Sequence, residues 1–259
     1  MATQDEKTQV KVMKNVMKYL QNTSFDKTPP EMSMHVHRII RETSKCGDPY
    51  KDVKDKSNKN AMRLYPKLKK IVEKSDDKLL TAVKLAIAGN VIDYGVPNRF
   101  DITNTINKVL KKDFAINDYE NFKKDLDLAK NVLYIADNAG EIVFDKLLLE
   151  ELNGKNVFFA VKSGPIINDA TVEDTEIAGI DKIAKIVTNG SPSPGVLLNH
   201  CSKEFLSYYK NTDVVIAKGQ GNYESLSNES VYFLLMVKCP LVANDLNVDI
   251  GDMILKGGK

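Results

Sequence analysis

The 259-residue sequence lacks several features that mark particular classes of protein. Its only cysteines, Cys46, Cys201 and Cys239, stand far apart without metal-ligand spacing, so neither a disulfide framework nor a zinc site is expected. Its longest apolar run, residues 231–237, is far shorter than the roughly 20 residues that a membrane-spanning helix needs. Residues 1–18 contain no apolar segment typical of a secretory leader, which favours a cytoplasmic location.

An excess of charge of one sign is also missing. The 37 lysines and arginines nearly balance 35 aspartates and glutamates, so composition provides no electrostatic reason to expect nucleic acid as a partner. Hydrophobic residues make up 42% and charged residues 28%, as in ordinary globular proteins. The sequence therefore predicts a folded protein that binds neither nucleic acid nor a membrane, and a small or anionic ligand remains open.

Common catalytic and nucleotide-binding signatures are absent as well. A G-x-G pair begins at Gly219, but Glu224 stands where a dinucleotide fingerprint needs its third glycine, and no phosphate-binding P-loop follows. No serine lies in a Gly-x-Ser-x-Gly elbow. The three histidines are isolated or two positions apart, which favours packing or surface roles over metal ligation.

The first half of the chain shows helical periodicity. Met13, Met17 and Leu20 recur on one face of a first helix, and we expect that face to lie in the core. Further helices are predicted near residues 31–44, 50–73, 79–92, 102–111 and 118–130. The lysine-rich helix at 50–73 has only a thin apolar stripe, typical of a solvated outer helix, whereas that at 79–92 should be buried. Residues 1–128 are thus predicted to form an all-helical amino-terminal subdomain.

From residue 131 onward, short apolar runs alternate with helical segments. Strands are predicted at 132–136, 157–161, 185–188, 213–217, 231–237 and 241–242, with helices at 141–152, 171–178 and 195–209. Strands that are apolar on both faces and alternate with helices indicate a mostly parallel sheet covered on both sides. The predicted fold of residues 129–259 is therefore a three-layer α/β/α sandwich.

Polar clusters follow three of these strands. They read DNAGE at 137–141, KSGP at 162–165 with Asn168 and Asp169 after it, and KGQGN at 218–222. Ligands of open parallel sheets bind outside the carboxyl ends of the strands, where such clusters converge. Carboxylate and amide oxygens are ligands suited to Mg²⁺ or Mn²⁺. Asp137, Asn138 and Asp169 are the candidate metal ligands.

The same clusters also have a purely structural interpretation. Asp-Asn pairs after strands are common helix caps and turn residues, and Glu141, in a first helical turn, stabilises the helix dipole without any ligand. Asn90 and Asp93 mark either a helix end or the lining of a cleft. Capping alone does not call for Lys218 at a third strand end, so the combination favours a site. The Ser163-Gly164 turn has backbone N–H groups suited to a phosphate, and Lys218 has the matching charge.

The motifs resemble those of one family. Residues 86–95 (AIAGNVIDYG), 137–141, 162–169 (KSGPIIND) and 218–224 (KGQGNYE) together resemble the DUF89 family of damage-control phosphatases, in particular its short archaeal and bacterial members. The resemblance implies a helical part on a three-layer α/β/α domain and a divalent metal ion, for which we consider Mg, Mn, Co or Ni. Many short members carry a Cys-x-x-Cys near the amino terminus, which this chain lacks, so no role tied to that pair is expected.

By this resemblance the chain is a metal-dependent phosphatase acting on small phosphorylated metabolites, such as sugar phosphates or damaged and overflow metabolites. The implied metal ligands are Asp137, Asn138 and Asp169; the catalytic residues are Asp137, Asp169 and Lys218; and the substrate-binding residues are Asn90, Asp93, Glu141, Ser163, Gly164 and Lys218. The nucleophile is either water, which we favour, or an aspartate.

Two other functions stay open at this point. Glycine-rich strand ends would also suit an S-adenosylmethionine-dependent methyltransferase acting on carboxyl groups, an activity also proposed within the family. A third alternative is a non-catalytic protein that binds a metabolite in the same pocket. The sequence determines neither the physiological substrate nor the oligomeric state.

Overall fold

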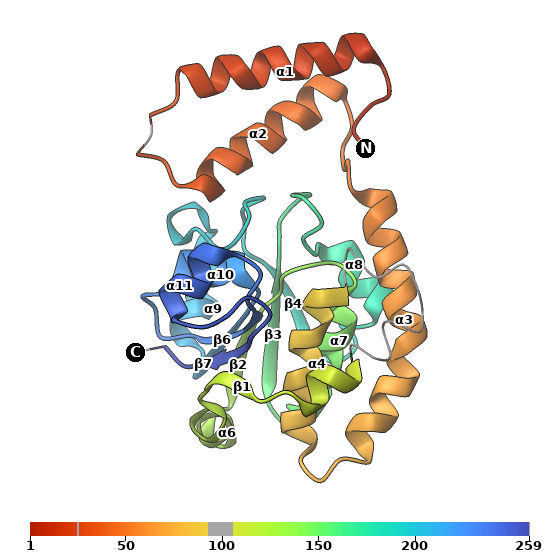
Figure 1. The fold of residues 1–259 in the computed structure, drawn as a ribbon, viewed down its shortest axis with the longest axis vertical. Coiled ribbons are helices and arrows are strands. Elements are labelled where there is room, and N and C mark those ends of the chain that lie inside the picture. The colour runs from red at the N-terminus through yellow and green to blue at the C-terminus, as the bar shows by residue number, and fades with distance from the viewer. Residues whose placement is uncertain (25, 93–105, 259) are drawn as a thin grey trace.

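The computed structural model describes residues 1–24, 26–92 and 106–258. Its helices (Figure 1) include α1 (Glu6–Gln21), α2 (Pro29–Ser44), α3 (Lys51–Glu73), α4 (Lys78–Ile92), α6 (Tyr119–Leu128), α7 (Glu141–Glu151), α8 (Val172–Ala178), α9 (Lys203–Asn211), α10 (Gln220–Leu226), α11 (Pro240–Leu246) and the 3₁₀ turn η1 (Leu198–His200). Its strands are β1 (Phe114–Asn117), β2 (Asn131–Ile135), β3 (Asn156–Val161), β4 (Lys185–Thr188), β5 (Val214–Lys218), β6 (Tyr232–Met236) and β7 (Met253–Lys256). Among the residues that the structure describes, no helix is long and apolar enough to cross a membrane.

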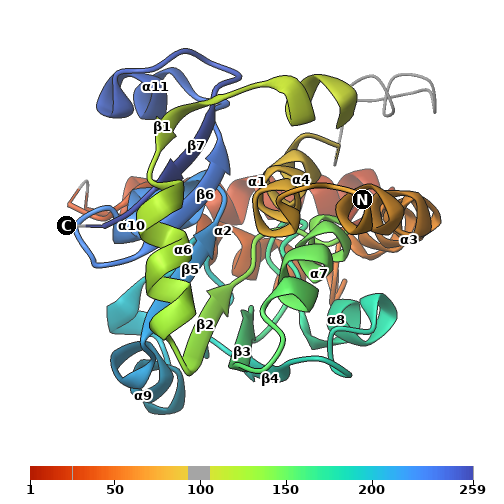
Figure 2. The same cartoon turned by 90° about the horizontal axis from the view of Figure 1, so that it is seen from below.

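These strands form one sheet in the order β1-β7-β6-β5-β2-β3-β4 (Figure 2). All neighbouring strands are parallel except β6 and β7, which are antiparallel. The strand order reverses at β2, because β3 and β4 continue on one side of it and β5 and β6 on the other. Such a switch point is where open α/β sheets bind their ligands.

Successive side chains of the strands enter opposite layers, as the period of a strand requires. Val132 and Tyr134 of β2 belong to the core beneath α4 and α7, whereas Leu133 and Ile135 belong to the core beneath α9, α10 and α11. The three-layer α/β/α fold with a mostly parallel sheet is thus confirmed.

Helix α4 is the buried helix that its composition predicted. Six of its apolar residues have no exposed surface: Ala82, Val83, Leu85, Ala86, Ile87 and Ala88. A Cβ on Gly89 would lie 2.9 Å from Cβ of Phe144 in α7, so a larger residue at this position would force the two helices apart. This close packing brings the next residue, Asn90, towards the carboxyl end of the sheet.

The expectation of an all-helical segment up to residue 128 is wrong at one point. Strand β1 lies within this segment and pairs with β7, which also escaped prediction. Both strands have only four residues, and they pair across more than half of the chain, so local periodicity carries little signal for either. The division into parts 1–128 and 129–259 stays a prediction, with the sheet drawing strands from both.

Two predicted elements of the carboxyl-terminal half also need correction. Residues 241–242 lie in helix α11 instead of a strand, because Pro240 at its first turn starts a helix. The single helix predicted at 195–209 is instead the turn η1 followed by α9, which begins after Ser202, whose side chain accepts a hydrogen bond from the backbone N–H of Phe205.

The apolar face of α1 does not lie in the core as expected. Met13 and Met17 are 58% and 60% exposed, and Leu20 is also exposed. Figure 1 shows α1 and α2 as a hairpin at one end of the molecule. Helix α1 packs chiefly on α2, where the ring centroids of Tyr19 and His35 are 5.3 Å apart. The opposite side of α1 therefore stays exposed.

The exposure of α1 predicts which substitutions the fold tolerates. The double substitution Met13→Lys and Met17→Lys should change the free energy of unfolding by less than about 0.5 kcal/mol, as for other surface sites. Leu234→Ala, at a position of β6 with no exposed surface, should cost about 2 to 5 kcal/mol through the cavity that it leaves. Urea denaturation measures both, and a comparable loss in the methionine variant would contradict the exposed position of α1.

Candidate functional site

The three predicted metal ligands come together at the switch point of the sheet. Asp137 and Asn138 lie just after β2, separated from it by Ala136, and Asp169 lies in the loop after β3. Asn138 and Asp169 pair in an isolated antiparallel bridge, and the backbone N–H of Ala170 donates to the carbonyl oxygen of Asp137 at 2.9 Å. Backbone hydrogen bonds therefore hold the two loops beside each other.

The side chains of Asn90 and Glu141 join this group, and their predicted contact with the substrate stays a prediction. The amide nitrogen of Asn90 donates to Asp137 Oδ2 at 2.9 Å and to Glu141 Oε2 at 2.8 Å. That of Asn138 donates to the same two oxygens, at 2.9 and 3.0 Å. Two amides thus bridge two carboxylates contributed by α7 and by the end of β2. Asp93, the other predicted residue of α4's end, lies outside the described residues.

Gly219 allows the closest backbone approach in the site. Its φ is +79°, which favours glycine, and a Cβ there would lie only 1.9 Å from Asp137 Oδ2. Any side chain at this position would displace the carboxylate of Asp137. Gly219, in the KGQGN motif, therefore leaves space for the carboxylate of Asp137, which follows the neighbouring strand β2.

Lys218 is fully buried beneath this cluster. Its Nζ donates to Glu141 Oε1 at 2.7 Å, to Asp145 Oδ1 at 2.5 Å and to the carbonyl oxygen of Ala86 at 2.8 Å. An ammonium group has three hydrogens, so these partners use all of them. In this arrangement the charge of Lys218 acts on the cluster through Glu141, and its predicted role beside the phosphate stays a prediction.

Asp145 is a site residue that sequence reasoning missed. It is buried, binds Lys218 and accepts a hydrogen bond from the hydroxyl of Tyr134 at 2.8 Å, while its Oδ2 has no partner among the described residues. It stands four residues after Glu141 on α7, and residues at this spacing share a helix face. That spacing was the available signal.

Lys162 is a second cation of the site to which the sequence assigned no role. Its Nζ lies 3.4 Å from Asp169 Oδ2 and donates to the carbonyl oxygen of Gly195. The next residue, Ser163, is exposed and Gly164 is half-buried, on the loop that also carries Asp169. Whether this turn contacts a phosphate stays a prediction.

The loop after β3 contains a strained residue. Ile167 has a φ of +43°, a conformation that a β-branched residue rarely adopts. Such strain costs about 1 to 3 kcal/mol and concentrates at functional sites, where the surroundings enforce it. The backbone N–H of Asp169 donates to the carbonyl oxygen of Ile166 at 3.0 Å, which closes the turn that presents Asp169.

The acidic groups are held at an electrostatic cost. Burial, together with the charges of Glu141 and Asp169, raises the pKa of Asp137 well above its usual value. Burial raises the pKa of Asp169 to about 6 despite the nearby ammonium of Lys162. It raises the pKa of Asp145 to about 7 despite Lys218. Each carboxylate would therefore gain from additional positive charge.

This chemistry fits a hard divalent cation. Asp137, Asn138 and Asp169 provide carboxylate and amide oxygens, the donors that Mg²⁺ and Mn²⁺ prefer. Within residues 1–24, 26–92 and 106–258, no three His, Cys, Asp or Glu side chains form a metal-binding group. The predicted set contains only two carboxylates, and Mg²⁺ commonly binds through one or two, keeping water or phosphate oxygens as its other ligands.

Comparison with known proteins identifies the family of this chain. The sequence-family model of the damage-control phosphatase ARMT1-like domain matches residues 1–254. A damage-control phosphatase of Pyrococcus horikoshii is 42% identical over 82% of this chain and 75% of its own length, and one of Archaeoglobus fulgidus is 39% identical over 87% and 81%. The crystal structure of a DUF89 family protein from Pyrococcus horikoshii superposes with a TM-score of 0.89 at 37% identity, covering 100% of this chain and 92% of that one. The chain therefore belongs to the DUF89 family of ARMT1-like damage-control phosphatases.

Proposed function

We propose that this phosphatase hydrolyses phosphomonoesters of small metabolites with the help of one divalent cation, Mg, Mn, Co or Ni, held by Asp137, Asn138 and Asp169. The observation that carries the proposal is the convergence of these oxygen donors at the switch point, with the pKa values of both aspartates raised. Such a cation would supply Lewis-acid charge to the phosphoryl oxygens. The same cation would stabilise the two carboxylates.

The surrounding side chains orient this group. Asn90 and Asn138 hold Asp137 in place by two amide hydrogen bonds to one oxygen, which leaves the other oxygen for the cation. Lys218 fixes Glu141 and adds positive charge beneath the site, which supports its proposed part in stabilising a phosphoryl transition state. Lys162 adds a second positive charge beside Asp169.

The substrate is proposed to enter from the side of the α1 and α2 hairpin. Arg41 of α2 donates to the carbonyl oxygen of Pro165 at 2.6 Å. The hydroxyl of Ser191 donates to Sδ of Met34, also on α2, at 3.8 Å. These contacts place α2 against loops that follow β3 and β4 (Figure 1). The metabolite attached to the phosphate would meet α2, which makes this helix a candidate for selecting the substrate.

Phosphate release tests the proposal directly. The purified protein should release phosphate from members of a panel of sugar phosphates and from p-nitrophenyl phosphate when Mg²⁺, Mn²⁺, Co²⁺ or Ni²⁺ is added, and a chelator should stop the reaction. Activity that persists in chelator would contradict the cation. No release with any cation, together with a rise in melting temperature on adding S-adenosylmethionine, would point to methyl transfer instead.

The ligand assignment predicts the effect of two isosteric substitutions. Asp137→Asn and Asp169→Asn should each lower kcat/KM by more than about 100-fold, because loss of a ligand exceeds the effect typical of outer-shell partners. Neither should lower the melting temperature of metal-free protein, since each removes a carboxylate whose raised pKa disfavours the folded state at neutral pH.

Asp213→Asn is the matched control for these variants. Asp213 lies at the opposite ends of the strands, where its carboxylate accepts the backbone N–H groups of Lys130 and Asn131 at 2.9 and 2.8 Å. This variant should keep full activity. Full activity in Asp137→Asn and Asp169→Asn would refute the metal assignment.

We propose water as the nucleophile, in preference to an aspartate. Acid quenching during turnover of a ³²P-labelled substrate should then leave the protein unlabelled. Label that resists acid, is released by hydroxylamine and is absent from Asp137→Asn would identify Asp137 as the nucleophile instead.

A further inference from the structure

Helix α3 carries two polar side chains that are buried although most of its length faces solvent. Asn58 has no exposed surface and Lys54 is only 2% exposed. The lysine-rich sequence of this helix indicated a solvated element with little functional content. Burying an amide and an ammonium group costs free energy unless their hydrogen-bonding atoms find partners, so the partners of these residues explain why they are there.

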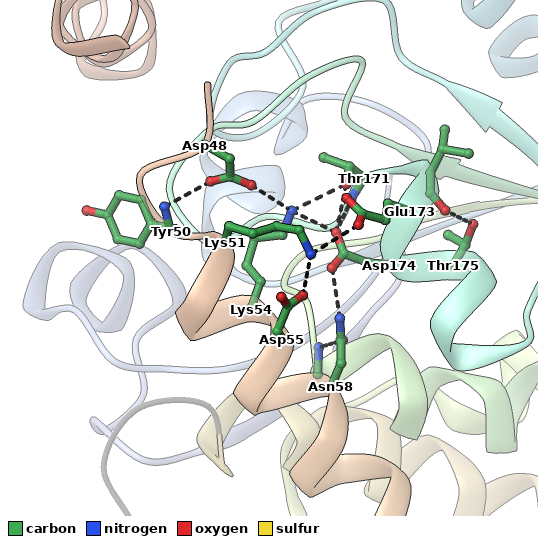
Figure 3. A network of polar contacts seen from close by, with 12 residues as sticks. Asp48, Tyr50, Lys51, Lys54, Asp55, Asn58, Thr171, Glu173, Asp174 and Thr175 are labelled. Carbon is green, nitrogen blue, oxygen red and sulfur yellow. Dashed lines mark hydrogen bonds and ion pairs between the residues drawn. The ribbon is translucent and has the colours of Figure 1, made fainter. Parts of the chain in front are cut away.

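Asn58 contacts the loop that carries Asp137 and Asn138 and also the first turn of α8, the helix that follows the Asp169 loop. Its Oδ1 accepts the backbone N–H of Gly140 at 2.6 Å, in the loop that begins with Asp137 and Asn138. Its Nδ2 donates to Asp174 Oδ1 at 2.8 Å, at the start of the helix that follows the Asp169 loop. One side chain therefore connects the Asp137-Asn138 loop with the start of α8, and Figure 3 shows its hydrogen bond to Asp174.

The backbone of α3 lies directly against the first loop. Gly140 has a φ of +79°, and a Cβ there would lie 2.8 Å from Cβ of Ser57 and 3.1 Å from its carbonyl carbon. The glycine therefore permits both the turn after Asn138 and the close approach of α3. Contact at this point limits how closely the loop can approach α3, and the hydrogen bond from Gly140 to Asn58 opposes its movement away.

The second loop is held through Asp174. Its Oδ2 accepts hydrogen bonds from the backbone N–H and the hydroxyl of Thr171, both at 2.8 Å, and pairs with Lys54 at 2.8 Å. Lys54 also reaches Asp48 and the hydroxyl of Thr171, each at 3.3 Å (Figure 3). These contacts anchor the residues directly after Ala170, whose N–H binds Asp137.

We infer that Asn58 is a positioning residue that sets the separation between the Asp137-Asn138 pair and Asp169, with Lys54 holding Asp174 as its partner. The inference rests on the proposed function insofar as these residues bind a cation. It assigns α3 a role in cation affinity, although neither side chain is one of the proposed ligands. Outer-shell partners of this kind commonly change metal affinity by about 10- to 100-fold.

The test measures Mn²⁺ binding by electron paramagnetic resonance, which detects unbound Mn²⁺ and requires no turnover. Asn58→Ala removes both hydrogen bonds and should raise the Kd for Mn²⁺ by about 10- to 100-fold. Asn58→Asp keeps the volume and the acceptor for Gly140 but replaces the donor to Asp174 with a negative oxygen, so it should also weaken binding. If the alanine variant does not fold, the aspartate variant decides.

Leu68→Ala is the control for a general loss of stability. Leu68 is fully buried in the hydrophobic core, on the same helix but about 15 Å along its axis from Asn58. This variant should lower the melting temperature and leave the Kd for Mn²⁺ unchanged. If Leu68→Ala raises the Kd for Mn²⁺ as much as the Asn58 variants do, destabilisation alone accounts for the weaker binding.

The outcomes separate this inference from the proposed function. A folded Asn58 variant that binds Mn²⁺ as tightly as the wild type overturns the inference. Wild-type protein that binds Mn²⁺ but releases no phosphate refutes the proposed function alone, since the comparison of Kd values still decides the role of Asn58. Wild-type protein that binds no Mn²⁺ refutes the metal site and the inference together.

Discussion

Buried negative charge at the carboxyl ends of β2 and β3 is the constraint on which the candidate site depends. Four carboxylates and two ammonium groups share this region: Asp137, Glu141, Asp145, Asp169, Lys162 and Lys218. The lysines offset part of the charge, and burial raises the pKa values of three of the acids despite these lysines. The divalent cation of the proposed function would add positive charge to this group.

The fold supplies the means to hold these charges together. The reversal of strand order at β2 places the ends of β3 and β5 on either side of it, so three strand ends meet at one point. Two glycines permit the necessary approaches, since Gly89 lets α4 pack closely on α7 and Gly219 leaves space for the carboxylate of Asp137. Asn90 and Lys218 then reach the acids from different elements. The network therefore depends on backbone contacts that no single segment provides.

Several features of the same region lower the stability of the folded state. A β-branched residue at positive φ, a buried carboxylate oxygen without a described partner and aspartates with raised pKa values all lie within it. Proteins tolerate such features where function requires them and where the surroundings enforce them. The contacts of Asn58 and Lys54 from α3 are part of that enforcement. A helix on the outside of the molecule thus contacts the backbone on both sides of the candidate site.

Much of the fold could be predicted because its signals are local. Alternation of apolar runs with helical periodicity indicated the parallel sheet, the absence of a polar face indicated the buried α4, and polar clusters after strands indicated where Asp137, Asn138 and Asp169 would meet. The pairing of β1 with β7 and the helical state of residues 241–242 lay beyond this reasoning. Very short segments carry too little periodicity to reveal their partners.

The sequence by itself determined which oxygen donors stand at the strand ends, because the strands and the residues that follow them can be recognised from local pattern. Only the tertiary structure decided how these donors are charged and supported. The exposed face of α1, the enclosure of Lys218 by Glu141 and Asp145, and the bridge made by Asn58 all arise between segments far apart in the chain. Burial and pairing of a side chain depend on what packs against it, and that information lies in the three-dimensional arrangement.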